Sequence, residues 1–130
     1  MEQKNKEQEL NVKFQILEQQ IMAIQRQLQA VEQTLLDMAS LKLGLDEIKK
    51  DKEILSQVGA GIFAKSKLIS EELVVAIGEK NYIKKSIPET KKLIQEQIVK
   101  LEIAKESLEG ELEKINEEVT RAMGEYQGKD

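Results

Sequence analysis

The sequence predicts an α+β fold, mainly α, in which a long antiparallel two-helix coiled coil carries two short β-hairpins in its middle. Two stretches of apolar residues, spaced alternately four and three apart, stand at opposite ends of the 130-residue chain and predict the helices. Between them the apolar period changes to two, which is typical of strands. Because the two seams are nearly equal in length, a chain that reverses in the middle pairs them from end to end. A single domain over residues 1–130 is expected.

The first seam predicts a helix over about residues 5–52, with glutamine, glutamate and lysine at the positions outside the seam. Only 3% of residues are aromatic while 34% are charged, a balance that suits long helices with a narrow apolar seam. The residues of this seam are Leu10, Phe14, Leu17, Ile21, Ile24, Leu28, Val31, Leu35, Met38, Leu41, Leu45 and Ile48.

The second seam predicts a helix over about residues 87–126. Ser86 is placed to cap its first turn, and Glu89 follows where the helix dipole favours an acid. Lys91 and Lys105 interrupt the seam, where a lysine either extends its stem out to water or discriminates against wrong registers. The seam residues are Ile87, Ile94, Ile98, Leu101, Leu108, Leu112, Ile115, Val119, Ala122 and Tyr126.

The middle segment, about residues 54–85, predicts four short strands that form two hairpins. Gly59-Ala60-Gly61 precedes a strand instead of opening a helix, so a turn is a better interpretation than a phosphate-binding loop. Gly78 marks the second turn. The expected strands are 54–58, 62–68, 73–77 and 82–85.

Two isolated hairpins are marginal in water, and their unpaired edges are templates for other chains. Oligomerisation through the strands is therefore expected, with apolar strand residues at the interfaces. The candidate assembly residues are Ile54, Val58, Ile62, Phe63, Ala64, Leu68, Leu73, Val75, Ile77, Tyr82 and Ile83.

Catalytic chemistry has little support in this composition. The chain has no histidine and no cysteine, which removes the commonest general base and metal ligand together with any disulfide or thiolate site. Neighbouring carboxylates, Glu71 with Glu72 and Glu117 with Glu118, are expected on solvated surface, since adjacent helical residues do not face one site. We expect no enzyme activity, no cofactor and no metal.

The net charge of −4 favours neither nucleic acid nor a membrane surface as a partner. The cluster of Lys49, Lys50 and Lys52 is expected to be a solvated helix end and not a phosphate-binding patch. The first sixteen residues are too polar for a secretory signal, and no apolar run approaches the roughly twenty residues that span a bilayer. A cytoplasmic location is expected.

The middle segment resembles the prefoldin alpha subunit. Residues 53–65 are similar to that family's first strand and its Gly-Ala-Gly-x-Phe stretch, while 74–78 and 82–87 are similar to the second hairpin and the entry to the last helix. Departures are Gln57, where a proline is usual, and Glu79-Lys80-Asn81 in a turn that is usually rich in small residues. Both hairpins are present, whereas the beta subunit has one.

The resemblance implies an ATP-independent chaperone, found as a hetero-hexamer of two alpha and four beta subunits in an archaeal cytosol. It further implies that the hairpins assemble into an oligomeric double β-barrel from which the coiled coils project. Their free ends would hold unfolded protein for transfer to a group II chaperonin. A structural coiled-coil scaffold, or a filament-forming prefoldin relative, is the alternative.

Apolar residues near the free ends of both helices are the candidate client-binding residues. Val12 and Met123 lie off the seam and are the sharper candidates, since methionine adapts to varied partners. The seam residues would become accessible when the last turns open, or they simply pair with one another. The full set is Leu10, Val12, Phe14, Leu17, Val119, Ala122, Met123 and Tyr126.

Overall fold

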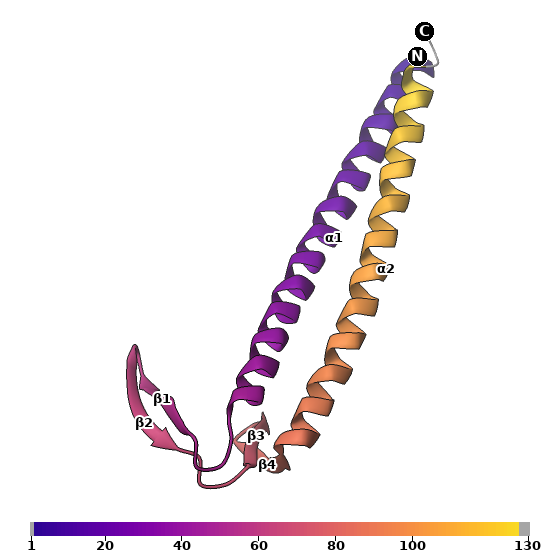
Figure 1. The fold of residues 1–130 in the computed structure, drawn as a ribbon. Helices are drawn as coiled ribbons and strands as arrows, with labels where there is room; N and C mark the ends of the chain where they lie inside the picture. The colour runs from indigo at the N-terminus through magenta and orange to yellow at the C-terminus, as the bar shows by residue number, and fades with distance from the viewer. Residues whose placement is uncertain (1, 128–130) are drawn as a thin grey trace. The chain divides into compact units, whose positions relative to one another are not determined.

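The computed structural model describes residues 2–127, with side chains described at 4–125. Along the chain, a long helix precedes two small antiparallel hairpins and a second long helix follows them, as predicted (Figure 1). The elements are α1 Glu2–Glu47, β1 Glu53–Gly59, β2 Ile62–Lys67, β3 Glu72–Gly78, β4 Asn81–Ser86 and α2 Ile87–Gln127. The contacts divide the chain into two units: unit 1 holds residues 1–35 and 100–130, and unit 2 holds residues 36–99.

Unit 1 is a pair of helical segments, the first part of α1 and the last part of α2, that run in opposite directions (Figure 1). Its most buried side chains, Leu17, Ile24 and Ala122, all belong to the predicted seams. Lys105 Nζ lies 3.8 Å from Glu32 Oε1 of the other helix and 4.0 Å from Glu109 Oε1. A seam lysine in this unit is therefore directed to acids on both helices.

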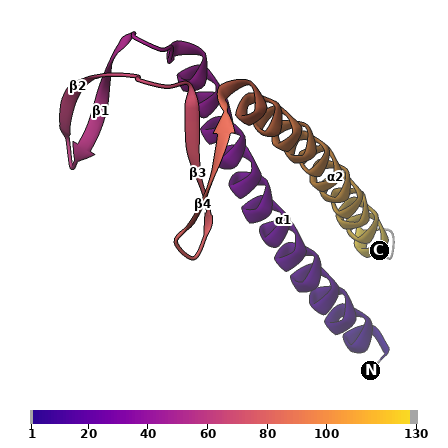
Figure 2. The same ribbon diagram turned by 90° about the horizontal axis from the view of Figure 1, so that it is seen from below.

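Unit 2 contains the end of α1, both hairpins and the start of α2 (Figure 2). Leu45, Ile87 and Ile94 are its buried apolar residues, and each is a seam position. The second seam lysine, Lys91, places its Nζ 2.6 Å from Asp46 Oδ1. Both lysines of the second seam thus pair with an acid across the helix interface.

The first helix ends earlier than the sequence predicts. A helix to about residue 52 was expected, but α1 ends at Glu47, and Ile48 lies just beyond it. The reason is local: Asp51 adopts a positive φ of 67°, and its N–H donates to the Leu68 carbonyl at 2.9 Å. Lys52 Nζ donates to the Glu47 carbonyl at 3.0 Å, which satisfies one of the last carbonyls of the helix.

The two hairpins are equivalent at every paired position. Adding nineteen to each residue of the β1–β2 register reproduces the β3–β4 register, from Glu53↔Lys67 and Glu72↔Ser86 to the last pair before each turn. The irregularity also recurs, between Gln57 and Gly59 and between Ala76 and Gly78. A bulge at the same place gives both hairpins the same change of face before the turn.

The turns differ between the hairpins, although the strands agree. In the first, Gly61 has a φ of 74°, a conformation for which glycine is suited. In the second, Glu79 and Lys80 have φ values of 43° and 65°. Two consecutive positive φ values characterise a type I′ turn, which glycine and asparagine usually occupy. The second turn therefore holds two side chains in a strained backbone.

The second helix begins as its sequence predicts. Ser86 Oγ accepts a hydrogen bond from the Glu89 N–H at 3.2 Å, and the Ser86 carbonyl accepts one from Thr90 Oγ1 at 2.9 Å. A serine cap with a glutamate three residues later is the capping-box pattern, which fixes the first turn. The direct junction of β4 and α2 at Ser86 positions the second hairpin at the start of the helix.

Candidate assembly and client-binding surfaces

Each hairpin leaves one of its two faces open. We define the open faces by their apolar members, Leu55 and Phe63 in the first hairpin and Val74 and Tyr82 in the second. Leu55 and Phe63 are 67% and 57% exposed, and Val74 and Tyr82 are 65% and 64% exposed. These residues occupy equivalent positions in the two hairpins, because Val74 follows Leu55, and Tyr82 follows Phe63, by nineteen residues. Apolar side chains that share one face in this way mark an interaction surface, unlike single scattered ones.

The opposite face is half-buried in the second hairpin, whereas in the first hairpin Ile54 and Ser56 are half-buried and Ala64 is exposed. In the second hairpin that face carries large apolar residues, Leu73, Val75 and Ile83. In the first hairpin the residues nineteen positions earlier are Ile54, Ser56 and Ala64, so the corresponding face is smaller and more polar. The hairpins therefore share their register but not the chemistry of this face.

The residues predicted for assembly fall on both faces. Ile62, Phe63, Ala64, Ile77, Tyr82 and the bulge residue Val58 are exposed. Leu68 lies one residue beyond β2, in an isolated bridge with Lys50. The half-buried members are Ile54, Leu68, Leu73, Val75 and Ile83.

Sequence reasoning missed Leu55 and Val74, whose side chains point to the open faces. It chose the neighbouring residues instead, Ile54 in β1 and Leu73 and Val75 in β3, as the apolar face. The two hairpins repeat the same residue types nineteen positions apart: a glutamate, two apolar residues, a glycine, an aromatic residue and a lysine. Aligning the two copies of this repeat pairs Leu55 with Val74 and Phe63 with Tyr82. That internal repeat is the signal that could have found them.

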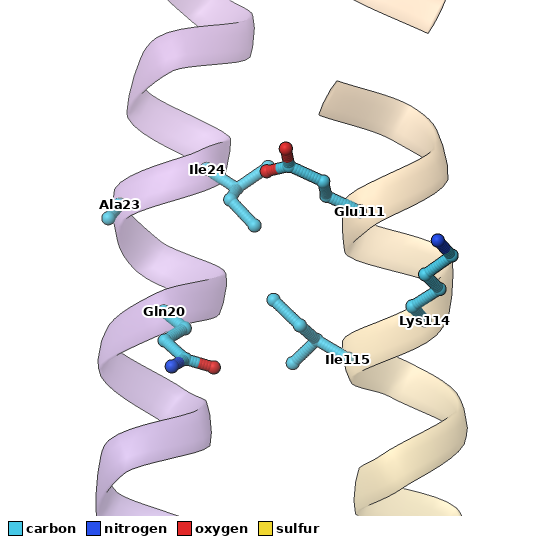
Figure 3. A pocket seen from close by; sticks show the side chains of 6 residues that line it. All are labelled: Gln20, Ala23, Ile24, Glu111, Lys114 and Ile115. Carbon is cyan, nitrogen blue, oxygen red and sulfur yellow. The ribbon is translucent and has the colours of Figure 1, made fainter. Parts of the chain in front are cut away.

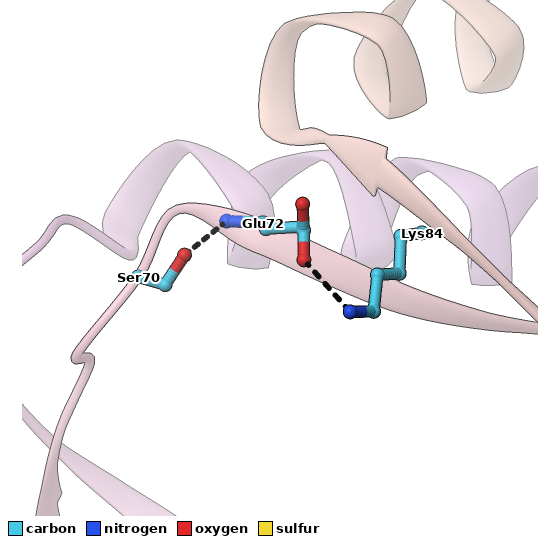
Figure 4. A network of polar contacts seen from close by, with 3 residues as sticks. All are labelled: Ser70, Glu72 and Lys84. Atoms are coloured by element: carbon cyan, nitrogen blue, oxygen red, sulfur yellow. Dashed lines mark hydrogen bonds and ion pairs between the residues drawn. The ribbon is translucent and has the colours of Figure 1, made fainter.

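Polar contacts on the second hairpin join Ser70, Glu72 and Lys84 (Figure 4). Lys84 Nζ lies 3.7 Å from Glu72 Oε1, and the Glu72 N–H donates to Ser70 Oγ at 3.1 Å. Both charged side chains are more than half exposed, and such pairs stabilise by only about 0.2–1 kcal/mol. The pair orients side chains beside Val74 and does not cover it.

The strand edges are also open within the described residues. Each sheet has two strands, so the outer edge of every strand lacks a partner strand among residues 2–127. Lysines occupy two of these edges, Lys65 and Lys67 on β2 and Lys84 and Lys85 on β4. Edge lysines oppose unspecific pairing. The edges of β1 and β3 carry one glutamate each and are otherwise uncharged.

Unit 1 contains a shallow groove of about 430 Å³ along the helix pair. Ile24 and Ile115 point toward each other from the two helices and form its apolar floor (Figure 3). Polar side chains stand at its border, so the groove offers an apolar strip with a solvated rim. Its lining residues are Gln20, Ala23, Ile24, Glu111, Lys114 and Ile115.

The predicted client-binding residues differ in accessibility. Val12 and Met123, which lie off the seam, are 54% and 51% exposed. Leu10, Phe14 and Val119 are half-buried, whereas Leu17 and Ala122 are buried in the seam. Tyr126 belongs to the last turn of α2, and its side chain lies outside the described residues. Ile16 and Met22 are also accessible apolar residues, 50% and 52% exposed, and the sequence reasoning did not name them.

The ionisable groups offer structural pairs. Among the side chains described at residues 4–125, no three acidic groups converge in a metal-binding arrangement. The hydrogen bond from Lys91 lowers the pKa of Asp46 below its ordinary value of 3.8; burial opposes this shift, and the charges of Lys91 and Lys42 add to it. Lys42 Nζ also donates to Gln95 Oε1 at 2.8 Å, so Lys42 and Lys91 both link the two helices in unit 2.

The family model for the prefoldin subunit matches residues 17–129, which include both hairpins and most of both helices. The chain belongs to the prefoldin family. This is a family of chaperones, and prefoldin subunits assemble with other prefoldin subunits. No helix within the described part of this prefoldin is both long and apolar enough to cross a bilayer.

Relatives of this prefoldin chain support an alpha-type subunit. Prefoldin subunit alpha of Methanosphaera stadtmanae is 32% identical over 97 residues, which cover 73% of this chain and 70% of the relative. Prefoldin subunit alpha of Methanococcus vannielii is 25% identical over 113 residues, 86% and 77% of the two chains. The presence of two hairpins agrees with the alpha type.

A solved structure shares the prefoldin fold of this chain. The cryo-EM structure of filamentous PFD from Methanocaldococcus jannaschii matches with a TM-score of 0.72 at 18% identity. The match covers 88% of this chain and 98% of that one. At this identity the likeness establishes the fold of helices and hairpins and says nothing of the surfaces.

Proposed function

We propose that this chain is the alpha subunit of an ATP-independent holdase that captures unfolded protein and delivers it to a group II chaperonin in the cytosol. The proposed particle contains two copies of this chain and four beta subunits. The open faces and free edges of the hairpins join the subunits, and the helical unit 1 contacts the client.

The observation that carries the assembly step is the exposure of both hairpin faces. Leu55, Phe63, Val74 and Tyr82 are each more than half exposed, on hairpins of only two strands. Strands of this kind need additional strands or a covering layer for stability. Neighbouring subunits with hairpins of their own supply both, since they extend the sheets and cover the apolar faces.

Client binding is supported by the accessible apolar side chains of unit 1. Val12 and Met123 are exposed without any opening of the helices, and the half-buried Ile115 adds an apolar side chain in the shallow groove of this unit. Each such contact is weak for an unfolded segment. Several subunits that present the same residues bind one chain together, which raises the overall affinity without a deep pocket.

Two measurements test this proposal. Mixing the chain with an archaeal beta-type subunit should give a particle with the mass of two alpha and four beta subunits by native mass spectrometry. Replacing Phe14, Met123 and Tyr126 with serine should weaken the suppression of client aggregation while the particle mass stays the same. Unchanged suppression by an intact particle would reject these residues as client contacts.

A filament or scaffold is the second candidate function. It is favoured by the similarity in fold to a solved structure of filamentous PFD. Sizing of the chain alone and with a beta subunit separates the two candidates. A single defined mass supports the holdase, whereas growth with concentration supports the filament.

A further inference from the structure

We propose that one side of the helix pair in unit 1 binds unfolded client segments that carry basic side chains close to apolar ones. We call this side the methionine face and define it as the positions that directly follow a seam residue, between residues 11 and 32 of α1 and between 102 and 123 of α2. The inference rests on the proposed function, because it names the class of segment that the holdase takes.

Contacts within unit 1 show that these positions share one side of the pair. Glu32 of α1 and Glu109 of α2 each follow a seam residue, and their Oε1 atoms lie 3.8 and 4.0 Å from Lys105 Nζ. The groove described above is bordered instead by residues that precede a seam residue, such as Gln20 and Glu111 (Figure 3). The positions before and after a seam residue therefore form two opposite sides of the helix pair.

Two exposed methionines give the face its apolar contacts. Met22 and Met123 are 52% and 51% exposed, one from each helix. Because Ile24 and Ile115 point toward each other across the antiparallel pair, Met123 lies at about the level of residue 16, on the order of 10 Å from Met22 along the axis. Methionine is flexible and polarisable, so such a pair accepts apolar side chains of varied shape.

The charged members of the methionine face are all acids. Lys105, at the seam, pairs with two of them, while no lysine or arginine among the described side chains forms an ion pair with the others. Arg26 stands at the border of the face, where its Nε donates to the Met22 carbonyl at 3.4 Å. Even with both cations counted, the face keeps an excess of negative charge. The acids, all exposed, are Glu18, Glu32, Glu102, Glu106, Glu109 and Glu113.

The opposite side of the same helix pair has no such excess. Over the matching stretch, residues 13–34 and 104–125, the positions that precede a seam residue hold as many bases as acids. The acidic character therefore belongs to one side of unit 1 and not to the unit as a whole. The charged residues of the opposite side are Lys13, Glu111, Lys114, Glu118, Arg121 and Glu125.

Charge complementarity identifies the segment that fits. Glu18 lies about one turn from Met22 on α1, and Glu113 of α2 lies about one turn beyond Met22 in the other direction. An extended chain advances about 3.3 Å per residue, so a lysine or arginine about two residues from an apolar side chain on Met22 reaches one of these carboxylates. An acidic segment is repelled by the same groups. The face thus favours unfolded segments in which basic and apolar residues alternate closely.

Each of these contacts is weak, because all the groups are exposed and salt screens their charges. Two favourable ion pairs change an affinity by about fivefold. Several subunits that present the same face to one client multiply this preference. The attraction also steers basic segments toward the helix pair before contact, which raises the association rate at low salt.

Methyl NMR of the full chain with labelled methionines tests the proposal at the face itself. The probe is an unstructured peptide of Leu-Ser-Lys-Ser repeats, and a matched peptide carries glutamate in place of lysine. The lysine peptide should shift the Met22 and Met123 methyl signals and leave that of Met38, which is half-buried in the seam of unit 2. It should bind at least about fivefold more tightly than the glutamate peptide, and a rise in salt from about 50 mM to about 500 mM should remove most of this difference.

A pair of matched variants separates the face from the net charge of the chain. Glu18→Gln with Glu113→Gln should weaken binding of the lysine peptide about fivefold, because it removes the acids on both sides of Met22. Glu111→Gln with Glu118→Gln makes the same change in net charge on the opposite side and should keep the affinity within about twofold. Circular dichroism checks that both variants keep their helix content.

The outcomes separate this inference from the proposed function. Equal affinity for the lysine and glutamate peptides, in a chain whose particle suppresses client aggregation, overturns the inference and leaves the holdase in place. Equal losses in the two variants, or equally tight binding of a lysine peptide whose leucines are replaced with serine, reduce the effect to net charge and also overturn it. A preference for the lysine peptide with shifts at Met22 and Met123, in a chain whose particle holds no unfolded client, supports the methionine face and rejects the holdase.

Discussion

Replacing Leu55 and Phe63, the two apolar residues of the first open face, with serine should raise the dissociation constant of subunit assembly about a hundredfold. Leu55 and Phe63 are 67% and 57% exposed in the single chain. Full burial of such a side chain is worth about 1.5–3 kcal/mol. Burial of the exposed fractions in an assembly therefore contributes about 3 kcal/mol together, and each 1.4 kcal/mol is a factor of ten in the dissociation constant.

The assay is a titration of Leu55→Ser/Phe63→Ser with a beta-type prefoldin subunit, followed by mass photometry. Val12→Ser/Met123→Ser is the matched control, because these residues are 54% and 51% exposed in unit 1. It removes a similar apolar area and should leave the affinity unchanged. The reasoning is refuted if the hairpin variant keeps its helix content and assembles within about threefold of the original affinity.

Three further predictions concern the stability of unit 2 and of the helices. Ile94→Ala should lower the free energy of unfolding by about 2 kcal/mol or more, because Ile94 is buried in the seam, whereas Ile103→Ala at an exposed site should change it by less than about 0.5 kcal/mol. Lys80→Gly should raise stability by about 1 kcal/mol, because glycine relieves the positive φ of this turn residue. Asp46→Asn should reduce the loss of stability in acid: the lowered pKa of Asp46 contributes stability above pH 3.8 that is lost as the pH falls through the folded-state value. Lys91→Met should have the same effect, since Lys91 is the main cause of that shift.

Thermal unfolding followed by circular dichroism checks all three, with the acid series run from pH 6 to pH 2. Equal effects at residues 94 and 103 would mean that the seam of unit 2 is not packed as described. Ala60→Gly is the control, because Ala60 is a turn residue without a positive φ and its replacement by glycine should lower stability. A similar loss of stability for Lys80→Gly would contradict the strained turn. Identical acid profiles for the original chain and the Asp46 variant would contradict the ion pair.

The sequence was sufficient for the elements, because each has a local signal. Period-two segments bounded by glycine located all four strands to within one residue. The Ser86 cap located the start of α2. The end of α1 was misplaced because the interaction that ends the helix is not local: the Asp51 N–H bonds to Leu68, seventeen residues further along the chain.

The surfaces were less predictable than the elements, for a physical reason. A period of two marks both faces of a strand equally when both carry apolar residues, so the period alone gave no basis for choosing between Ile54 and Leu55 in β1 or between Leu73 and Val74 in β3. Tertiary packing decides which alternate residue is covered, and it covers Leu73 and leaves Val74 open. The off-seam residues Val12 and Met123, in contrast, were identified correctly as exposed from the heptad pattern alone.

Hydrogen–deuterium exchange tests most directly whether neighbouring subunits complete the hairpins. Exchange of the amides of residues 53–86 should be fast in the isolated chain at a concentration where it is monomeric by mass photometry, and slow in the particle formed with the beta subunit. Equally slow exchange of these amides in the verified monomer and in the particle would contradict the account, because the hairpins would then be stable without their neighbours.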